Sequence, residues 1–176
     1  VTRKIGASGG LHVRLSPHDA RTVDIKFMDR RGLNLSKDAE RNIERVFFRE
    51  DFRRVYLDEI GTIDYQQDVI ETYTADFIAK LNTQAIQAAH FSIAVDYANA
   101  PTSLVLPSIL RQLGVRVVEL NAGMDESKMS IPPQEFQQSL EQLAAICSAL
   151  RTNLGARLDV GGEKLFLVDD RGKVVP

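Results

Sequence analysis

Strand-like and helix-like segments alternate through the second half of this chain. Segments that read as strands occupy residues 91–95, 115–120, 157–159 and 165–168. Between them, residues 102–113 and 133–153 carry the apolar spacing of helices. Parallel strands need a crossover connection, and the usual connection is a helix. This order therefore predicts an α/β fold with a mainly parallel sheet and helices on both faces.

The first half carries fewer regular signals. Alternating apolar residues predict two strands, at about 11–15 and 22–28, and a glycine-containing segment at 29–32 predicts a turn after them. Ser36 is expected to cap a helix whose first turn carries acidic residues. A long helix is expected at about 65–82. The two strands form too small a sheet to be stable alone, so the chain is expected to associate through their edges.

Composition excludes several classes of partner. Lys and Arg number 22 against 24 Asp and Glu, and the net charge is −2, so neither a nucleic-acid groove nor a polybasic membrane surface is expected. Apolar runs are too short to span a bilayer. Cys147 lies in an apolar helical pattern and is expected in the core. As the single cysteine, it allows no disulfide within the chain, which suits a cytoplasmic protein.

The segment between the last two predicted strands carries acidic residues around two glycines. Asp159 and Glu163 flank Gly161 and Gly162, and Lys164 follows. Mg²⁺ prefers oxygen ligands in a near-octahedral arrangement, which alternate carboxylates of a tight loop can provide, but Gly161 offers no side-chain oxygen. A β-turn with solvated charges explains the same residues. The residues alone leave a weak metal site and a plain turn open.

A second candidate segment surrounds Ser16, in a polar loop between the first two predicted strands. A serine followed by proline in such a loop is ordinarily part of a turn. Pro17 also removes a backbone donor where a transferred phosphoryl group would need amide hydrogens. Lys26 and Asp24 alternate with apolar residues, which predicts that they lie on the solvent-exposed face of the second strand.

The third candidate segment is the predicted strand at 91–95, the loop of small residues after it and the following helix. A strand, a small-residue loop and a helix N-terminus can together bind an anion. A simpler interpretation is a βα turn in which Thr102 or Ser103 caps the helix.

Taken together, the three segments resemble the α-D-phosphohexomutases, the family of phosphoglucomutase and phosphomannomutase. Residues 159–164 are similar to the family's metal loop, which reads Asp-x-Asp-x-Asp-Arg. Residues 10–27 are similar to its phosphoserine loop, Ser-His-Asn-Pro, with the strands on either side. Residues 91–114 resemble the start of its second domain, where a strand ends in Asp-x-Gly-Asn-Gly.

This resemblance implies roles for five residues. Ser16 falls on the serine that carries the phosphoryl group, and Lys26 falls on a lysine proposed as an acid/base group. Asp159 and Glu163 fall on ligands of Mg²⁺, the cofactor expected for the family, and Lys164 falls on the arginine near the sugar phosphate. Because the middle carboxylate is missing, the resemblance implies a degenerate and weak metal site.

The resemblance covers nearly the whole chain and implies two domains of the mutase α/β/α type. Residues 1–63 would be the C-terminal part of domain I, and residues 64–176 the linking helix and domain II with the metal loop. Because the family's active site lies between four domains, the chain is not expected to turn over substrate alone. Its implied partners are a sugar phosphate, the remaining domains of a parent protein and a second copy of itself.

Three functions stay open. Residues 47–54, with the altered serine and metal loops, also resemble the mutase-like module of bacterial mannose-1-phosphate guanylyltransferases, which follows a sugar-1-phosphate nucleotidyltransferase domain. That resemblance favours a degenerate module that serves assembly or ligand binding. The alternative is a fragment of an active phosphoglucomutase or phosphomannomutase, with a phosphoserine and Mg²⁺-dependent phosphoryl transfer. A nucleotide-binding domain is the third, but the chain has neither a Gly-x-Gly-x-x-Gly motif nor a Walker loop. Either of the first two makes the parent protein an enzyme of sugar-phosphate metabolism.

Overall fold

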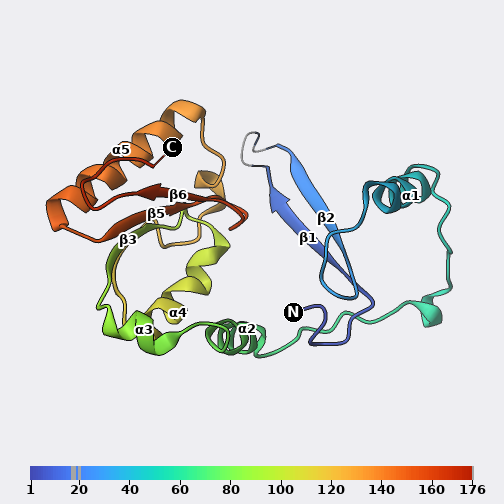
Figure 1. The fold of residues 1–176 in the computed structure, drawn as a ribbon. Helices are drawn as coiled ribbons and strands as arrows, with labels where there is room; N and C mark the ends of the chain where they lie inside the picture. The colour runs from blue at the N-terminus through green and yellow to red at the C-terminus, as the bar shows by residue number, and fades with distance from the viewer. Residues whose placement is uncertain (17–18, 20, 176) are drawn as a thin grey trace. The chain divides into compact units, whose positions relative to one another are not determined.

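The computed structural model describes residues 1–16, 19 and 21–175 of the protein. Two compact units are present (Figure 1). Unit 1 comprises Val1–Val13 and Ile25–Val69, and unit 2 comprises Arg14–Asp24 and Ile70–Pro176. The end of the first strand and the start of the second therefore belong to unit 2. The domain boundary between residues 63 and 64, which the resemblance implies, stays a prediction.

Two strands at the start of the chain, β1 (Gly9–Leu15) and β2 (Val23–Asp29), pair in a two-stranded sheet, as expected. The turn expected after them is confirmed. The Asp29 carboxylate accepts hydrogen bonds from the backbone N–H groups of Arg31 (2.8 Å) and Leu33 (3.0 Å). Gly32 supplies the positive φ of 78° that this tight turn requires.

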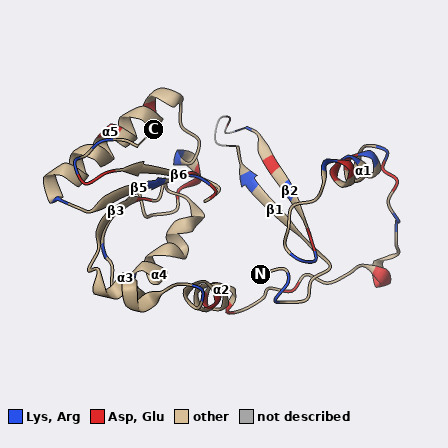
Figure 2. Ribbon diagram, in the orientation of Figure 1, with Lys and Arg blue, Asp and Glu red and all other residues tan. Residues whose placement is uncertain are grey.

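Helix α1 (Lys37–Phe48) follows, and a short 3₁₀ helix, η1 (Leu57–Glu59), comes after it. The expected cap is confirmed, because the Ser36 hydroxyl oxygen accepts a hydrogen bond from the backbone N–H of Ala39 at 3.3 Å. Figure 2 shows acidic and basic residues mixed along α1. None of the helix's residues is buried.

The single long helix expected at about 65–82 is wrong. Two shorter helices, α2 (Val69–Ile78) and α3 (Thr83–Ala88), take its place. The side chain of Asn82 accepts a hydrogen bond from the backbone N–H of Ala85 at 3.1 Å and so starts α3. An asparagine side chain can bond to backbone groups in place of the hydrogen bonds that would continue a helix, and the spacing of apolar residues gives no sign of this.

Unit 2 contains a four-stranded sheet in the order β4-β3-β5-β6. Its strands are β3 (Ser92–Asp96), β4 (Arg116–Leu120), β5 (Leu154–Leu158) and β6 (Leu165–Val168). The central strand β3 is parallel to both β4 and β5, whereas β6 is antiparallel to β5. Because only a short loop joins β5 to β6, that pair must be antiparallel. The mainly parallel sheet predicted from the sequence is confirmed.

Helices cover both faces of this sheet, which confirms the α/β prediction. Consecutive residues of β3 point to opposite faces. On one side, Val95 belongs to a cluster with Leu106 and Leu110 of α4 (Leu106–Gln112). On the other side, Ala94 packs with Cys147 of α5 (Pro133–Leu150), whose thiol is buried as expected. None of the helices among the described residues has the length and apolarity to cross a bilayer.

The end of α5 differs from the prediction. The helix stops at Leu150 because Arg151 adopts a left-handed conformation with a φ of 52°, so β5 begins at Leu154 and not at residue 157. Gly155 then lies directly under the helix. A Cβ atom on Gly155 would overlap the Cys147 sulfur and lie 3.0 Å from the Val168 Cβ, so glycine permits this close packing.

The helix predicted at 102–113 is also interrupted. A 3₁₀ helix, η2 (Pro101–Leu104), precedes α4, and neither helix has a side-chain cap. The expected cap by Thr102 or Ser103 is wrong, since the Ser103 hydroxyl donates to the backbone oxygen of Ala100 at 2.8 Å. With only seven residues in α4, the loop offers no extended helix N-terminus for an anion.

Candidate functional site

The loop that joins β5 to β6, residues 159–164, is a closed turn. The backbone N–H of Asp159 donates to the Lys164 oxygen at 3.1 Å, and that of Gly162 donates to the Asp159 oxygen at 3.0 Å. Gly162 has a φ of 67°, and a Cβ atom on it would lie 2.7 Å from the Thr102 Cγ2. Glycine at this position is therefore needed for both the backbone conformation and the close approach.

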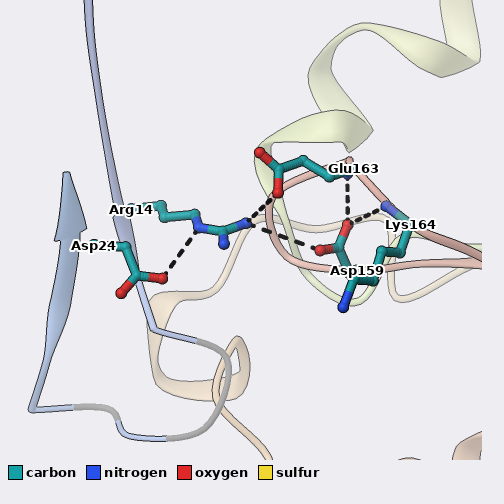
Figure 3. A network of polar contacts seen from close by, with 5 residues as sticks. All are labelled: Arg14, Asp24, Asp159, Glu163 and Lys164. Atoms are coloured by element: carbon teal, nitrogen blue, oxygen red, sulfur yellow. Dashed lines mark hydrogen bonds and ion pairs between the residues drawn. The ribbon is translucent and has the colours of Figure 1, made fainter. Parts of the chain in front are cut away.

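The Asp159 carboxylate holds this turn together from inside. Its Oδ1 accepts hydrogen bonds from the backbone N–H groups of Glu163 (2.6 Å) and Lys164 (2.9 Å). Its Oδ2 lies 3.9 Å from Nη1 of Arg14 (Figure 3). The site residues Asp159, Glu163 and Lys164 are thus brought together, but one carboxylate oxygen is already used by the loop's own backbone.

Arg14, at the end of β1, is the cation of this site. Its Nη1 lies 3.3 Å from Glu163 Oε2, and its Nε lies 3.4 Å from Asp24 Oδ2 (Figure 3). The side chain is only 15% exposed. Three carboxylates from two distant segments therefore surround one guanidinium, a planar group with several donors that suits such multiple pairing.

Arg14 was missed as a site residue when the sequence was considered alone. The available signal was its place in β1, where every second residue from Gly10 onward is partly buried and Arg14 falls on that same side. A charged side chain on the more buried side of a strand needs a partner of opposite charge. No sequence rule, however, points from there to acids about 150 positions away.

The residues of this loop do not fit the Mg²⁺ site that the resemblance implies. Gly161 supplies no ligand, and a Cβ atom on it would overlap Nη1 of Arg14, so the guanidinium fills the space beside it. Asp159 Oδ1 accepts two backbone hydrogen bonds. Across the described part of the chain, no group of three or more His, Cys, Asp or Glu side chains could hold a metal ion.

Ser16 lies in the same unit as this loop, two residues after Arg14. Its backbone N–H donates to the Thr22 oxygen at 2.9 Å and closes the segment between β1 and β2. Within that segment, hydrogen bonds from Arg21 and Thr22 lower the pKa of the Asp19 carboxyl. Pro17, on which the argument about a missing amide donor rested, lies outside the described residues.

Lys26 belongs to unit 1 and is therefore not in the unit that holds the other four predicted site residues. The prediction that Asp24 and Lys26 face solvent is wrong. Both are only partly exposed, whereas Val23 and Ile25, which alternate with them, are 52% and 53% exposed. The alternation is present, but the apolar residues Val23 and Ile25 lie on the more exposed side of the strand and Asp24 and Lys26 on the less exposed side. Asp24 lies there because it pairs with Arg14.

A pocket of about 200 Å³ in unit 2 adjoins the loop. Its walls are mainly apolar and include Met129 and Phe136, and Arg157, Asp159 and Lys164 add charged groups. Sugar rings need hydrogen-bonding partners on several sides, and these walls offer few. Lys164, the predicted substrate-binding residue, thus lines a pocket that suits an apolar group better than a sugar.

A buried ion pair joins β3 to β5, two residues before the loop in the chain. Asp96 ends β3 and is the register partner of Arg157 in β5, and their side chains are 2% and 6% exposed. Arg157 Nη1 donates to Asp96 Oδ2, while Asp96 Oδ1 accepts from Ala98 N (2.9 Å) and Asn121 Nδ2 (3.0 Å). The guanidinium also lies 5.5 Å from the centre of the Phe136 ring. Opposite charges at the matching ends of two apolar strands were the signal that sequence reasoning overlooked.

Comparisons with known proteins agree with this fold. Residues 71–172, more than half of the chain, match the family model described as "Phosphoglucomutase/phosphomannomutase, alpha/beta/alpha domain II". A phosphoglucomutase/phosphomannomutase of Thermococcus kodakarensis is 29% identical over 175 residues. A phosphoglucosamine/phosphogalactosamine mutase of Sulfurisphaera tokodaii is 25% identical over 175 residues. Each match covers 99% of this chain but only 38% of the relative.

Solved structures show the same fold. A putative phosphomannomutase from Thermus thermophilus superposes with a TM-score of 0.80 at 16% identity, covering 98% of this chain and 39% of that one. A phosphoglucomutase/phosphomannomutase family protein from Burkholderia thailandensis gives a TM-score of 0.76 at 19% identity, covering 96% and 35%. The chain thus spans well under half the length of these proteins. It belongs to the phosphoglucomutase/phosphomannomutase family, through the α/β/α domain II that residues 71–172 match.

Proposed function

We propose that this chain is a degenerate phosphohexomutase-like module that takes part in sugar-phosphate metabolism without mutase turnover of its own. In the parent protein it would accompany a sugar-1-phosphate nucleotidyltransferase domain of the mannose-1-phosphate guanylyltransferase type, and serve assembly or ligand binding. Residues 1–63 would be the end of mutase domain I, and residues 64–176 the linking helix and domain II. The sugar-phosphate class is supported by the relatives, which are named as mutases of phosphorylated sugars.

The observation that carries this proposal is the contact of Arg14 with the loop at 159–164. Phosphoryl transfer depends on several charged groups placed around the transferred group, and Mg²⁺ is usually one of them. In this loop the two carboxylates that would hold the metal face a guanidinium at 3.3 and 3.9 Å. The third position, Gly161, has no ligand atom. The loop therefore lacks a part that the chemistry needs.

The alternative is that the chain is a fragment of an active mutase. Ser16 would then carry the phosphoryl group, Lys26 would act as acid/base group, Lys164 would contact the sugar phosphate, and Asp159 and Glu163 would hold Mg²⁺. The names of the relatives fit this alternative equally well. It also gains some support from the position of Ser16, whose segment is held to the loop through Arg14.

A coupled assay separates the two proposals. The chain is supplied with glucose-1-phosphate or mannose-1-phosphate, Mg²⁺ and the sugar bisphosphate activator, and formation of the 6-phosphate is followed. We expect no turnover above a heat-inactivated sample, because the chain does not supply groups on every side that would stabilise the charge of the transition state. Turnover that disappears in Ser16→Ala would establish the active-mutase alternative.

The proposed fusion has its own test, which is the reading frame on either side of the gene segment for this chain. A sugar-1-phosphate nucleotidyltransferase domain encoded in the same frame is the expected result. A frame that encodes only the remaining mutase domains would contradict the fusion, whatever the outcome of the turnover assay.

A further inference from the structure

We infer that Arg14 is the permanent cation of the loop at residues 159–164 and performs there the neutralising and bridging role that a divalent metal would otherwise have. This inference goes beyond the proposed function, because it states what stabilises the loop and how a metal site could be regained. It depends neither on the nucleotidyltransferase fusion nor on the absence of turnover.

The contacts of the guanidinium are those of a bound cation. One nitrogen, Nη1, faces both Asp159 Oδ2 at 3.9 Å and Glu163 Oε2 at 3.3 Å, while Nε faces Asp24 Oδ2 at 3.4 Å (Figure 3). The side chains of Arg14 and Asp159 are each 15% exposed. Asp24 and Glu163 are 38% and 40% exposed, so it is the Arg14–Asp159 pair that salt screens far less than a surface pair. Removing Arg14 would take away the guanidinium charge that faces the mostly buried Asp159 carboxylate.

Gly161 gives independent support. Unlike Gly162, it does not have a positive φ, so the backbone at this position does not require glycine. A Cβ atom on Gly161 would, however, overlap Nη1 of Arg14 and lie 3.1 Å from its Cζ. Glycine at 161 is therefore explained by the space that the guanidinium needs. Arg14 and Gly161 therefore depend on each other, because the guanidinium occupies the space that a side chain at position 161 would fill. An internal cation takes the place of a carboxylate at this position.

The same contacts bind the serine segment to the loop. Arg14 is followed two residues later by Ser16, and both belong to unit 2 with the loop. The two segments are 149 positions apart in the chain. A bridging metal would hold such segments together only when bound, and its occupancy would follow the metal concentration. A guanidinium holds them at all times.

The experiment exchanges the internal cation for a binding site. The double variant Arg14→Ala, Gly161→Asp removes the guanidinium and places carboxylates at positions 159, 161 and 163. Binding of Mn²⁺, which has the same oxygen preference as Mg²⁺, is measured by electron paramagnetic resonance. We expect no saturable binding by the unchanged protein, and saturable binding of one Mn²⁺ per chain by the double variant. Adding Asp159→Asn to the double variant should abolish that binding.

Single variants and a folding control complete the design. Gly161→Asp alone should bind Mn²⁺ poorly, because the guanidinium of Arg14, although displaced by the new side chain, stays beside the carboxylates. Arg14→Ala alone should shift the amide resonances of Gly161 and Gly162, while Arg21→Ala, whose side chain is 94% exposed in the same unit, should leave them unchanged. Circular dichroism checks folding. If the double variant is unfolded, the double variant Arg14→Met, Gly161→Asp is used in its place, because methionine keeps an apolar side chain where the stem of Arg14 lies.

Two results would overturn the inference. One is stoichiometric Mn²⁺ binding by the unchanged protein that is lost in Asp159→Asn. The other is an Arg14→Ala variant whose Gly161 and Gly162 resonances match those of the unchanged protein. Mutase turnover by the unchanged protein would defeat the proposed function but not this inference, so the two can fail separately.

Discussion

Replacing Arg157 by methionine should destabilise unit 2 more than any surface substitution. Its guanidinium is 6% exposed and pairs with Asp96, which is 2% exposed, so the variant leaves a carboxylate buried without its cation. Breaking a buried pair in this way costs about 3–5 kcal/mol. Asp96 keeps hydrogen bonds from Ala98 and Asn121, which favours the lower end of that range. The lost contact with the Phe136 ring adds about 0.5–2 kcal/mol. We therefore expect a loss of about 4 kcal/mol in the free energy of unfolding.

A double variant checks the reason for this loss. Asp96→Asn together with Arg157→Met removes both charges, so it should recover about half of the stability lost in Arg157→Met. Urea denaturation followed by circular dichroism measures both variants, and Arg21→Met, whose side chain is 94% exposed in the same unit, is the matched control. The reasoning would be refuted if Arg157→Met were as mild as the control, or if the double variant were less stable than Arg157→Met alone.

Three further predictions concern the core, the serine and association. Burial, with a smaller contribution from Glu119, raises the pKa of Tyr97 from 10.0 to about 12. The neutral Tyr97 side chain therefore contributes fully to the stability of the fold below pH 10. This contribution is lost as the pH rises from 10 toward 12, because the tyrosine of the unfolded chain ionises first. Across this pH range the free energy of unfolding should fall by up to about 3 kcal/mol, and this fall should be absent in Tyr97→Phe; the same fall in both proteins would contradict this. Ser16 should carry no phosphate in protein purified from cells, and an added phosphate mass that is absent in Ser16→Ala would refute that. The isolated chain should self-associate in light scattering, since Val13 and Ile25 are 60% and 53% exposed, and a strict monomer at all concentrations would oppose it.

The sheet of unit 2 was predictable because its signals are local and repeated. The strands carry mostly apolar residues, each crossover carries a helical pattern, and parallel pairing follows from their order. The Ser36 cap was predictable for the same reason, since a cap depends on residues three positions apart. Asn82 shows the limit of such patterns, because its single hydrogen bond divided a region that otherwise reads as one helix.

The candidate site depends on pairs that no local pattern encodes. Arg14 and Glu163 are 149 positions apart, and Asp96 and Arg157 are 61 apart. The sequence did locate the acidic loop, and the resemblance assigned it to a metal. It could not show that an arginine from β1 fills the space beside Gly161. Pairing across such distances becomes visible only when the register of the strands is known.

A calorimetric titration of the unchanged chain with Mg²⁺ tests the central claim most directly, namely that this family member keeps the metal loop but neutralises it with Arg14. The account predicts no saturable heat, and a trace that matches that of Asp159→Asn, because the carboxylates at 159 and 163 already face a guanidinium and Gly161 adds no ligand. A one-to-one site of micromolar affinity that is present in the unchanged chain and lost in Asp159→Asn would contradict it.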